Sequence, residues 1–136
     1  MLGQWIIENY EPCRVADIGG GKGLLSFILR EAGFQPVVID PFYQKLPYKY
    51  KDLQTNERKK LSVEQMESIP RVSEPFEIQM TADFDLLIGL HAHGSNMKII
   101  DASDKFDKKF VILPCCVIDE PITKQPGINW INSLIE

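Results

Sequence analysis

The stretch from Val15 to Leu29, VADIGGGKGLLSFIL, constrains the fold of this chain more than any other part of it. It begins as the end of a buried, apolar strand. Glycines then follow at Gly19, Gly20, Gly21 and Gly23, and leucine and isoleucine recur at helical spacing up to Leu29. A strand, a glycine turn and a helix in this order bring a nucleotide-like ligand against bare backbone N–H groups at a helix N-terminus. Glycine suits this turn, because a Cβ atom would block the ligand or forbid the positive φ angles.

The spacing of the glycines indicates which class of ligand the turn binds. Asp17 to Gly23 reads D-x-G-x-G-x-G, which differs from the dinucleotide fingerprint G-x-G-x-x-G because Leu24 is the third residue after Gly21. A phosphate-binding P-loop frame cannot be laid on these residues either. The observed frame is typical of methyltransferases that use S-adenosylmethionine (SAM), in which the turn admits the amino-acid end of the cofactor. A glycine turn that only packs closely is the alternative.

Asp40 is the second candidate binding residue. It ends the apolar run Pro36–Ile39 and follows Asp17 by about 20 residues, the interval at which an acidic side chain reaches a ribose. A carboxylate there can accept both ribose hydroxyls. NAD-binding domains also bind a ribose through an acidic residue at this position. Asp40 therefore indicates a nucleoside ligand but does not distinguish SAM from NAD. Its alternative role is to cap the turn that begins at Pro41.

Strands that alternate with helices predict an α/β fold with a parallel sheet and helices on both faces. We expect helices over Leu2–Tyr10, from the glycine turn to Ala32, over Asn56–Ser68, Met97–Ser103 and Gly127–Glu136, and strands over Arg14–Ile18, Pro36–Asp40, Phe76–Met80, Phe84–Leu90 and Lys109–Leu113. One connection does not fit this pattern. Only Thr81, Ala82 and Asp83 separate Met80 from Phe84, whereas a parallel crossover takes about a dozen residues. Either Phe76–Met80 is not the third parallel strand, or the sheet edge after Asp40 is rebuilt.

The loop after the FDLLIGL strand supplies the candidate catalytic residue. In an open parallel sheet, ligands bind beyond the carboxyl ends of the strands, which assigns Gly89 and Leu90 to the cofactor pocket and places His91 and His93 at its mouth. His91 is the candidate general base, since an imidazole titrates near neutral pH. A structural histidine bonded to the backbone is the alternative. The adjacent Cys115 and Cys116 lack the spacing of a structural zinc site, so we expect packed thiols and no metal.

The segment from Tyr43 to Lys60 is the candidate RNA contact. It interleaves six Lys or Arg residues with three tyrosines, a combination that suits phosphates and stacked bases. The chain as a whole carries a net charge of −4, so any nucleic-acid contact must come from a local patch of this kind or from a partner. A solvated surface loop is the alternative reading of this segment.

The length of 136 residues predicts a single domain over residues 1–136. The three cysteines are odd in number and include an adjacent pair, which does not form a disulfide framework. We found neither a secretory signal pattern nor an apolar run of the roughly 18 residues that a membrane helix needs. These features together predict the reducing environment of the cytoplasm.

The sequence resembles the eukaryotic tRNA (uracil-2′-O-)-methyltransferase family. The resemblance runs from Arg14 to Asp119 and rests on the glycine motif, VVID, FDLLIGLH and FVILPCCVID, in the same order and at similar spacing. It implies a class I, SAM-dependent methyltransferase fold, in a truncated Rossmann-like form of four or five strands without the C-terminal strands of the complete sheet. Asp17, Gly19, Gly21 and Gly23 match the cofactor turn, Asp40 the ribose acid, and His91 with Gly94 the substrate-side loop.

Two functions follow from these observations. The first is a SAM-dependent methyltransferase that acts on RNA, with tRNA as the substrate that the resemblance implies. The second is a non-catalytic subunit that binds SAM or a nucleoside and supports a partner protein. An open sheet edge would favour a homodimer or a hetero-complex in either case.

Overall fold

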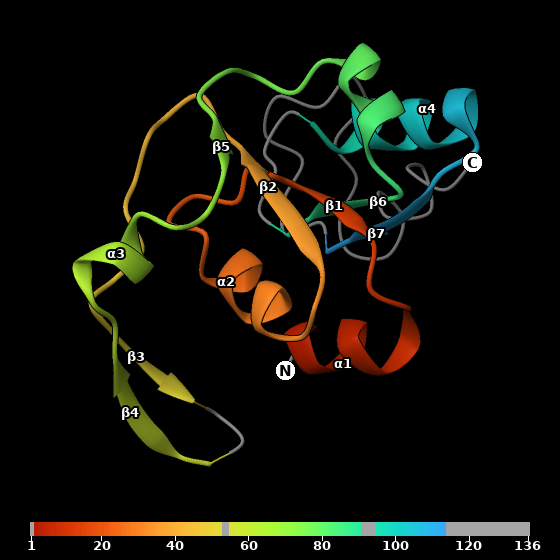
Figure 1. The fold of residues 1–136 in the computed structure, drawn as a ribbon. Helices are drawn as coiled ribbons and strands as arrows, with labels where there is room; N and C mark the ends of the chain where they lie inside the picture. The colour runs from red at the N-terminus through yellow and green to blue at the C-terminus, as the bar shows by residue number, and fades with distance from the viewer. Residues whose placement is uncertain (1, 53–54, 91–94, 114–136) are drawn as a thin grey trace, which may run out of the picture.

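The protein contains one five-stranded parallel sheet. The computed structural model describes residues 2–52, 55–90 and 95–113. The sheet has the order β5-β2-β1-β6-β7 (Figure 1). Its strands are β1 (Arg14–Ile18), β2 (Gln35–Ile39), β5 (Arg71–Val72), β6 (Leu86–Gly89) and β7 (Lys109–Ile112). The chain builds outward from β1 in one direction and then returns to build β6 and β7 on its other side. The topological switch point therefore lies between β1 and β6.

Helices cover both faces of the sheet, as the sequence predicts. On one face lie α1 (Leu2–Asn9) and α2 (Leu24–Glu31), and on the other lie α4 (Asn96–Phe106) and the 3₁₀ helix η1 (Ile78–Asp83) (Figure 1). The central strands can serve both layers because their side chains alternate between the two faces. Val15 packs in the α1–α2 layer, whereas Ala16 and Ile18 pack in the α4 layer.

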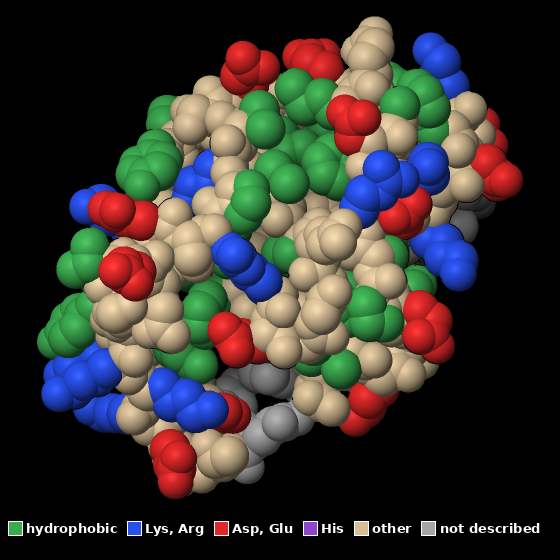
Figure 2. All heavy atoms as spheres, in the orientation of Figure 1, with side chains coloured by type: hydrophobic (Ala, Val, Ile, Leu, Met, Phe, Trp, Pro, Cys, Tyr) green, Lys and Arg blue, Asp and Glu red, His purple; other side chains and the backbone are tan. Residues whose placement is uncertain are grey.

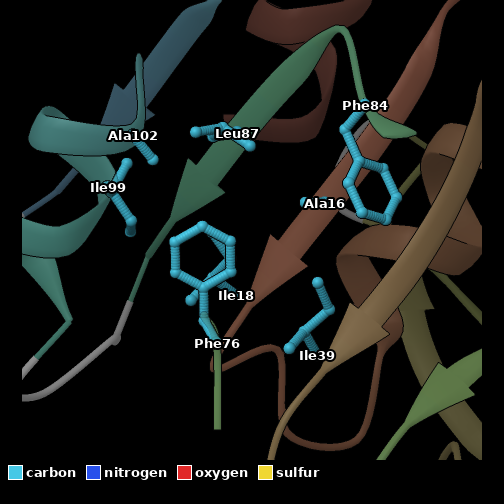
Figure 3. Close-up of a cluster of buried hydrophobic side chains, with 8 residues drawn as sticks. All are labelled: Ala16, Ile18, Ile39, Phe76, Phe84, Leu87, Ile99 and Ala102. Carbon is cyan, nitrogen blue, oxygen red and sulfur yellow. The ribbon is translucent and has the colours of Figure 1, made fainter. Parts of the chain in front are cut away.

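The core next to α4 includes two residues from outside the regular elements. Figure 3 shows Phe76 and Phe84 among side chains from β1, β2, β6 and α4. Phe76 is 2% exposed and Phe84 is 8% exposed. These rings fill the space between sheet and helix, so the segment that joins β5 to β6 is an integral part of the core.

The segment Phe76–Met80 is not a strand, which resolves the connection that did not fit. The third parallel strand is β5, whose two residues pair with Val38 and Ile39 of β2. The crossover from Val72 to Leu86 then contains thirteen residues, enough for a parallel connection, and η1 provides its helical part. The alternation that suggested a strand arises because Phe76 enters the core while Ile78 and Met80 pack against it from a 3₁₀ turn.

The helix expected over Asn56–Ser68 is also wrong in its first half. Residues Lys49–Asp52 form β3 and residues Glu57–Lys60 form β4, which pair as an antiparallel hairpin. Only Val63–Met66 is helical, as α3. Its N-terminus is fixed by a capping box in which Ser62 Oγ accepts the Gln65 N–H and the Gln65 side chain accepts the Ser62 N–H. The capping box needs the side chains of Ser62 and Gln65, so the helix begins directly after Ser62.

Several sequence predictions lie outside the described residues. These are His91, His93, Gly94, the Cys115–Cys116 pair and the helix expected over Gly127–Glu136. Within the described part of the chain, no helix is long and apolar enough to cross a membrane.

Phe76→Ala tests the role of the crossover segment in the core. Truncating a buried phenylalanine leaves a cavity and should lower the free energy of unfolding by about 3–5 kcal/mol. Phe42→Ala is the matched control, because Phe42 is 73% exposed, and it should change stability by no more than about 0.5 kcal/mol. Urea unfolding followed by circular dichroism measures both. Equal effects of the two variants would contradict the packing of Phe76.

Candidate functional site

The glycine turn joins β1 to α2 at the carboxyl edge of the sheet. Its glycines Gly19, Gly21 and Gly23 have φ angles of 66°, 57° and 88°. The turn is tied to β2, since the Gly19 N–H donates to the Ile39 carbonyl at 2.8 Å. At Gly20 the constraint is space, because a Cβ atom would lie 2.6 Å from Cγ of Asp17. The four glycines therefore permit a tight backbone that rests directly on the Asp17 side chain.

Asp40 connects the end of β2 to this turn. One carboxylate oxygen, Oδ2, accepts the Gly21 N–H at 3.0 Å, and the other, Oδ1, accepts the Phe42 N–H at 2.9 Å. The structure thus shows the capping role of Asp40. A carboxylate has about four lone-pair sites, so two acceptor positions are left after these two bonds. Asp40 is half-buried and can still accept ribose hydroxyls, which stays a prediction.

Asp17 lies beneath the glycine turn and not on its surface. The residue is 1% exposed, and its Oδ2 accepts the Ser26 hydroxyl of α2 at 2.7 Å. Burial raises the pKa of Asp17 to about 6, and the negative charge of Asp40 acts in the same direction. The Ser26 hydrogen bond and the positive charge of Arg71 lower this pKa in part. Asp17 therefore supports the turn and joins it to the first turn of α2.

Arg71 completes the candidate site, although no sequence pattern pointed to it. Its guanidinium donates to the Gly21 carbonyl at 2.7 Å and to the Lys22 carbonyl, and it lies 5.4 Å from the centre of the Tyr43 ring. Burial lowers the pKa of Arg71. Because a trans peptide places N–H and C=O on opposite sides, holding the Gly21 carbonyl fixes the direction of the Lys22 N–H. Arg71 thus orients the backbone of the turn.

Gly89 and Leu90 lie at the same edge of the sheet, across the switch point from the glycine turn. Ile88 of β6 is the register partner of Asp17 of β1, so the chain leaves β6 beside the turn. Gly89 is buried and Leu90 is half-buried. The next residue, His91, lies outside the described residues, so its part as a general base stays a prediction.

Two hollows lie elsewhere on the molecule. One, of about 430 Å³, separates α1 and α2 from the β3–β4 hairpin. The other, of about 590 Å³, lies where β6 and β7 begin, at the amino edge of the sheet, and is lined by residues such as Asp85 and Lys109. Neither includes the glycine turn. The turn is the candidate site because of its backbone and its carboxylates.

The fold and this edge define a Rossmann-like domain, and comparisons with known proteins show what the chain resembles. No protein-family model matches the chain. A curated relative, "Probable tRNA (uracil-O(2)-)-methyltransferase" of Caenorhabditis elegans, is 27% identical over 106 residues. The match covers 78% of this chain and 18% of that protein, so the chain spans less than a fifth of the relative's length. The resemblance found in the motifs is thus confirmed as a similarity of sequence.

Solved structures add a likeness of fold. The structure of monomeric WbdD matches over 89% of this chain and 32% of that chain, with a TM-score of 0.52 and 18% identity. CalO1, a methyltransferase of calicheamicin biosynthesis solved with SAH bound, has a TM-score of 0.46 and 15% identity over 96% of this chain and 39% of that one. The five-stranded sheet has the Rossmann-like fold that the motifs predicted, and the chain is similar in sequence to a methyltransferase.

Arg71→Gln tests how the turn is held. The variant loses a charged donor to two carbonyls, which should lower the free energy of unfolding by about 1–3 kcal/mol. It should also speed amide hydrogen exchange in Gly19–Gly23 while leaving β6 and β7 protected. Arg30→Gln is the control, because Arg30 donates to the Ser68 carbonyl, away from the turn. Exchange in the turn that is unchanged in Arg71→Gln would show that Arg71 does not hold it.

Asp17→Asn tests the buried carboxyl group. The native pKa of about 6 exceeds the ordinary value of 3.8, so the unfolded chain loses this proton first as the pH rises. The group therefore lowers wild-type stability progressively between about pH 4 and pH 6, by at most about 3 kcal/mol. Asparagine does not titrate and can still accept the Ser26 hydroxyl. Its stability relative to wild type should therefore rise over this interval.

Urea unfolding at several pH values from about 4 to 7 measures this shift. Asp101→Asn, at an exposed position of α4, is the control and should show no such relative gain. Parallel pH profiles for wild type and Asp17→Asn would contradict the raised pKa.

Proposed function

We propose that this chain is a SAM-dependent methyltransferase domain that acts on RNA, with SAM bound at the glycine turn. The observation that carries the proposal is the hydrogen bond of 3.0 Å between the Gly21 N–H and the Asp40 carboxylate, at the carboxyl edge beside the switch point. It places a bare backbone and an acidic side chain next to each other, where open parallel sheets bind their ligands. The similarity to a tRNA methyltransferase supports the same cofactor.

The residues present fit this cofactor. Gly19–Gly23 offers a turn without side-chain bulk for its amino-acid end, and the two acceptor positions left on Asp40 match two ribose hydroxyls. Gly89 and Leu90 would line the pocket from β6. The carboxylates of Asp17 and Asp40 also make the surroundings of the turn favourable for a cation.

When bound, SAM supplies an electrophilic methyl group on a positively charged sulfur. The chain's part is to hold cofactor and acceptor in line, since most of the rate gain in such a transfer comes from alignment. His91 would take the proton of an acceptor hydroxyl as the base. The turn, held by Asp40 and Arg71, would keep the cofactor end fixed during this step.

RNA is the proposed acceptor class, and the name of the relative, a tRNA methyltransferase, supports it. A reducing cytoplasmic compartment fits the cysteine pattern. Formation of a homodimer or a hetero-complex through an open sheet edge also stays a prediction. The competing function is that of a non-catalytic subunit that binds SAM or a nucleoside.

Gly21→Ala tests the binding of SAM. Gly21 has φ +57°, so alanine costs about 1–2 kcal/mol in backbone strain and adds a methyl group at the proposed cofactor surface. Isothermal titration should show wild-type binding of SAM and a loss of at least about ten-fold in the variant. Gly33→Ala is the matched control. Gly33 also has a positive φ, +93°, but it lies after α2, so this variant should carry similar strain and keep SAM affinity.

Two outcomes would redirect the proposal. Binding of NAD in place of SAM would indicate an oxidoreductase-type domain. Binding of SAM without methyl transfer to bulk RNA, with His91→Ala indistinguishable from wild type, would indicate the non-catalytic subunit. Methyl transfer that is lost in His91→Ala while SAM binding is kept would establish the enzyme.

A further inference from the structure

The β3–β4 hairpin sorts its charges onto two faces. Residues directly opposite each other in an antiparallel pair share a face. The register pairs Lys49 with Lys60 and Lys51 with Arg58, and it pairs Tyr50 with Lys59 and Asp52 with Glu57. Since alternate residues of a strand also share a face, the first two pairs form one face of four cations. We call Lys49, Lys51, Arg58 and Lys60 the cationic face.

The opposite face attaches the hairpin to the body of the protein. The Tyr50 ring meets the Phe27 ring of α2 edge-on, with centroids 6.1 Å apart. Lys59 Nζ lies 2.9 Å from Asp52 Oδ2, so the cation on this face has its own partner. At the base, the Leu61 N–H donates to the Tyr48 carbonyl at 2.7 Å, and Leu61 is buried in the same cluster as Phe27. The hairpin is thus held by one face and its base.

The cationic face has no acidic partner among the described residues. Each of its four side chains belongs to an exposed residue, and the ion pairs found in the described part of the chain involve other lysines and arginines. Like charges directly opposite each other destabilise a hairpin. Two such pairs on one face therefore oppose folding, and an anion lying across them would relieve this cost.

We infer that the cationic face is a docking surface for the phosphate backbone of an RNA strand. Figure 2 shows basic side chains gathered over the part of the molecule where Figure 1 places the hairpin. The two strands together carry five basic and two acidic residues, in a chain whose net charge is −4. This local reversal of charge would steer a polyanion to the hairpin and away from the rest of the surface. The choice of RNA rests on the proposed function.

The geometry favours a nucleic-acid strand over a lipid surface. Same-face positions along a strand lie about 7 Å apart, a spacing comparable to that of successive phosphates in one nucleic-acid strand. The exposed Tyr48, whose ring lies 5.1 Å from Lys49 Nζ, offers an aromatic surface at the base of the face for a stacked base. The Asp52–Glu57 pair at the turn end would repel an anionic membrane that met the hairpin end-on.

The double variant Lys51→Gln/Arg58→Gln tests this surface, because it removes one cation pair. Fluorescence anisotropy with a labelled single-stranded RNA should show an affinity at least about ten-fold below wild type at about 0.1 M salt. The slope of log affinity against log salt should become shallower by about 1.4, for two lost phosphate contacts. The matched control is Lys105→Gln/Lys109→Gln, which removes two exposed lysines and the same net charge elsewhere. It should bind RNA as wild type does.

The same samples are titrated with SAM, which separates this inference from the proposed function. Reduced RNA binding with thermal stability that is equal to or above that of wild type, and with an unchanged SAM response, supports the cationic face, even if no methyl transfer or SAM binding is found in any sample. Equal losses in test and control variants would overturn it, as would wild-type protein that binds no RNA. Co-sedimentation of wild type with phosphatidylserine vesicles in place of RNA binding would overturn it in favour of a membrane surface.

Discussion

The hydrogen bond from the Gly21 N–H to the Asp40 carboxylate connects the elements on which the site depends. It joins the turn after β1 to the residue after β2, and it can form only because the two strands are parallel neighbours in register. Arg71 adds a third strand to this arrangement by holding the carbonyls of the same turn. Three adjacent strands thus fix one short backbone segment. Glycines alone would leave that segment free to adopt several shapes.

The candidate site at the glycine turn has an excess of negative charge, whereas the cationic face of the hairpin has an excess of positive charge. At the turn, a buried carboxyl group and a capping carboxylate lie close together, and the positive charge of Arg71 offsets them only in part. On the cationic face of the hairpin, cations lie directly opposite cations. Each place has a surplus of one sign, and each surplus costs folding free energy in the absence of a ligand. Under the proposed function, a positively charged cofactor at the turn and a negatively charged RNA strand on the hairpin would relieve both.

Much of the sheet could be predicted from the sequence, because β1, β2, β6 and β7 are runs of apolar residues covered on at least one face. The glycine turn and Asp40 could be located for the same reason, since both directly follow such runs. The hairpin could not, because its strands consist mainly of charged residues and show no apolar alternation. Tyr50 of the hairpin contacts Phe27 of α2, a tertiary contact that no local sequence pattern reveals. Arg71 could not be assigned either, since a strand of two residues has no pattern.

The crossover between β5 and β6 shows how one misassigned strand and one missed site residue are related. With Phe76–Met80 taken as the third strand, the carboxyl edge beside β2 would end near Met80, and Arg71 would belong to a loop. With β5 at residues 71–72, the same edge brings Arg71 onto the glycine turn, and Phe76 is released to fill the core against α4. The three residues between Met80 and Phe84 are too few for a parallel crossover, which already argued against Phe76–Met80 as the third strand. The position of the third strand therefore decides both the packing of the core and the composition of the site.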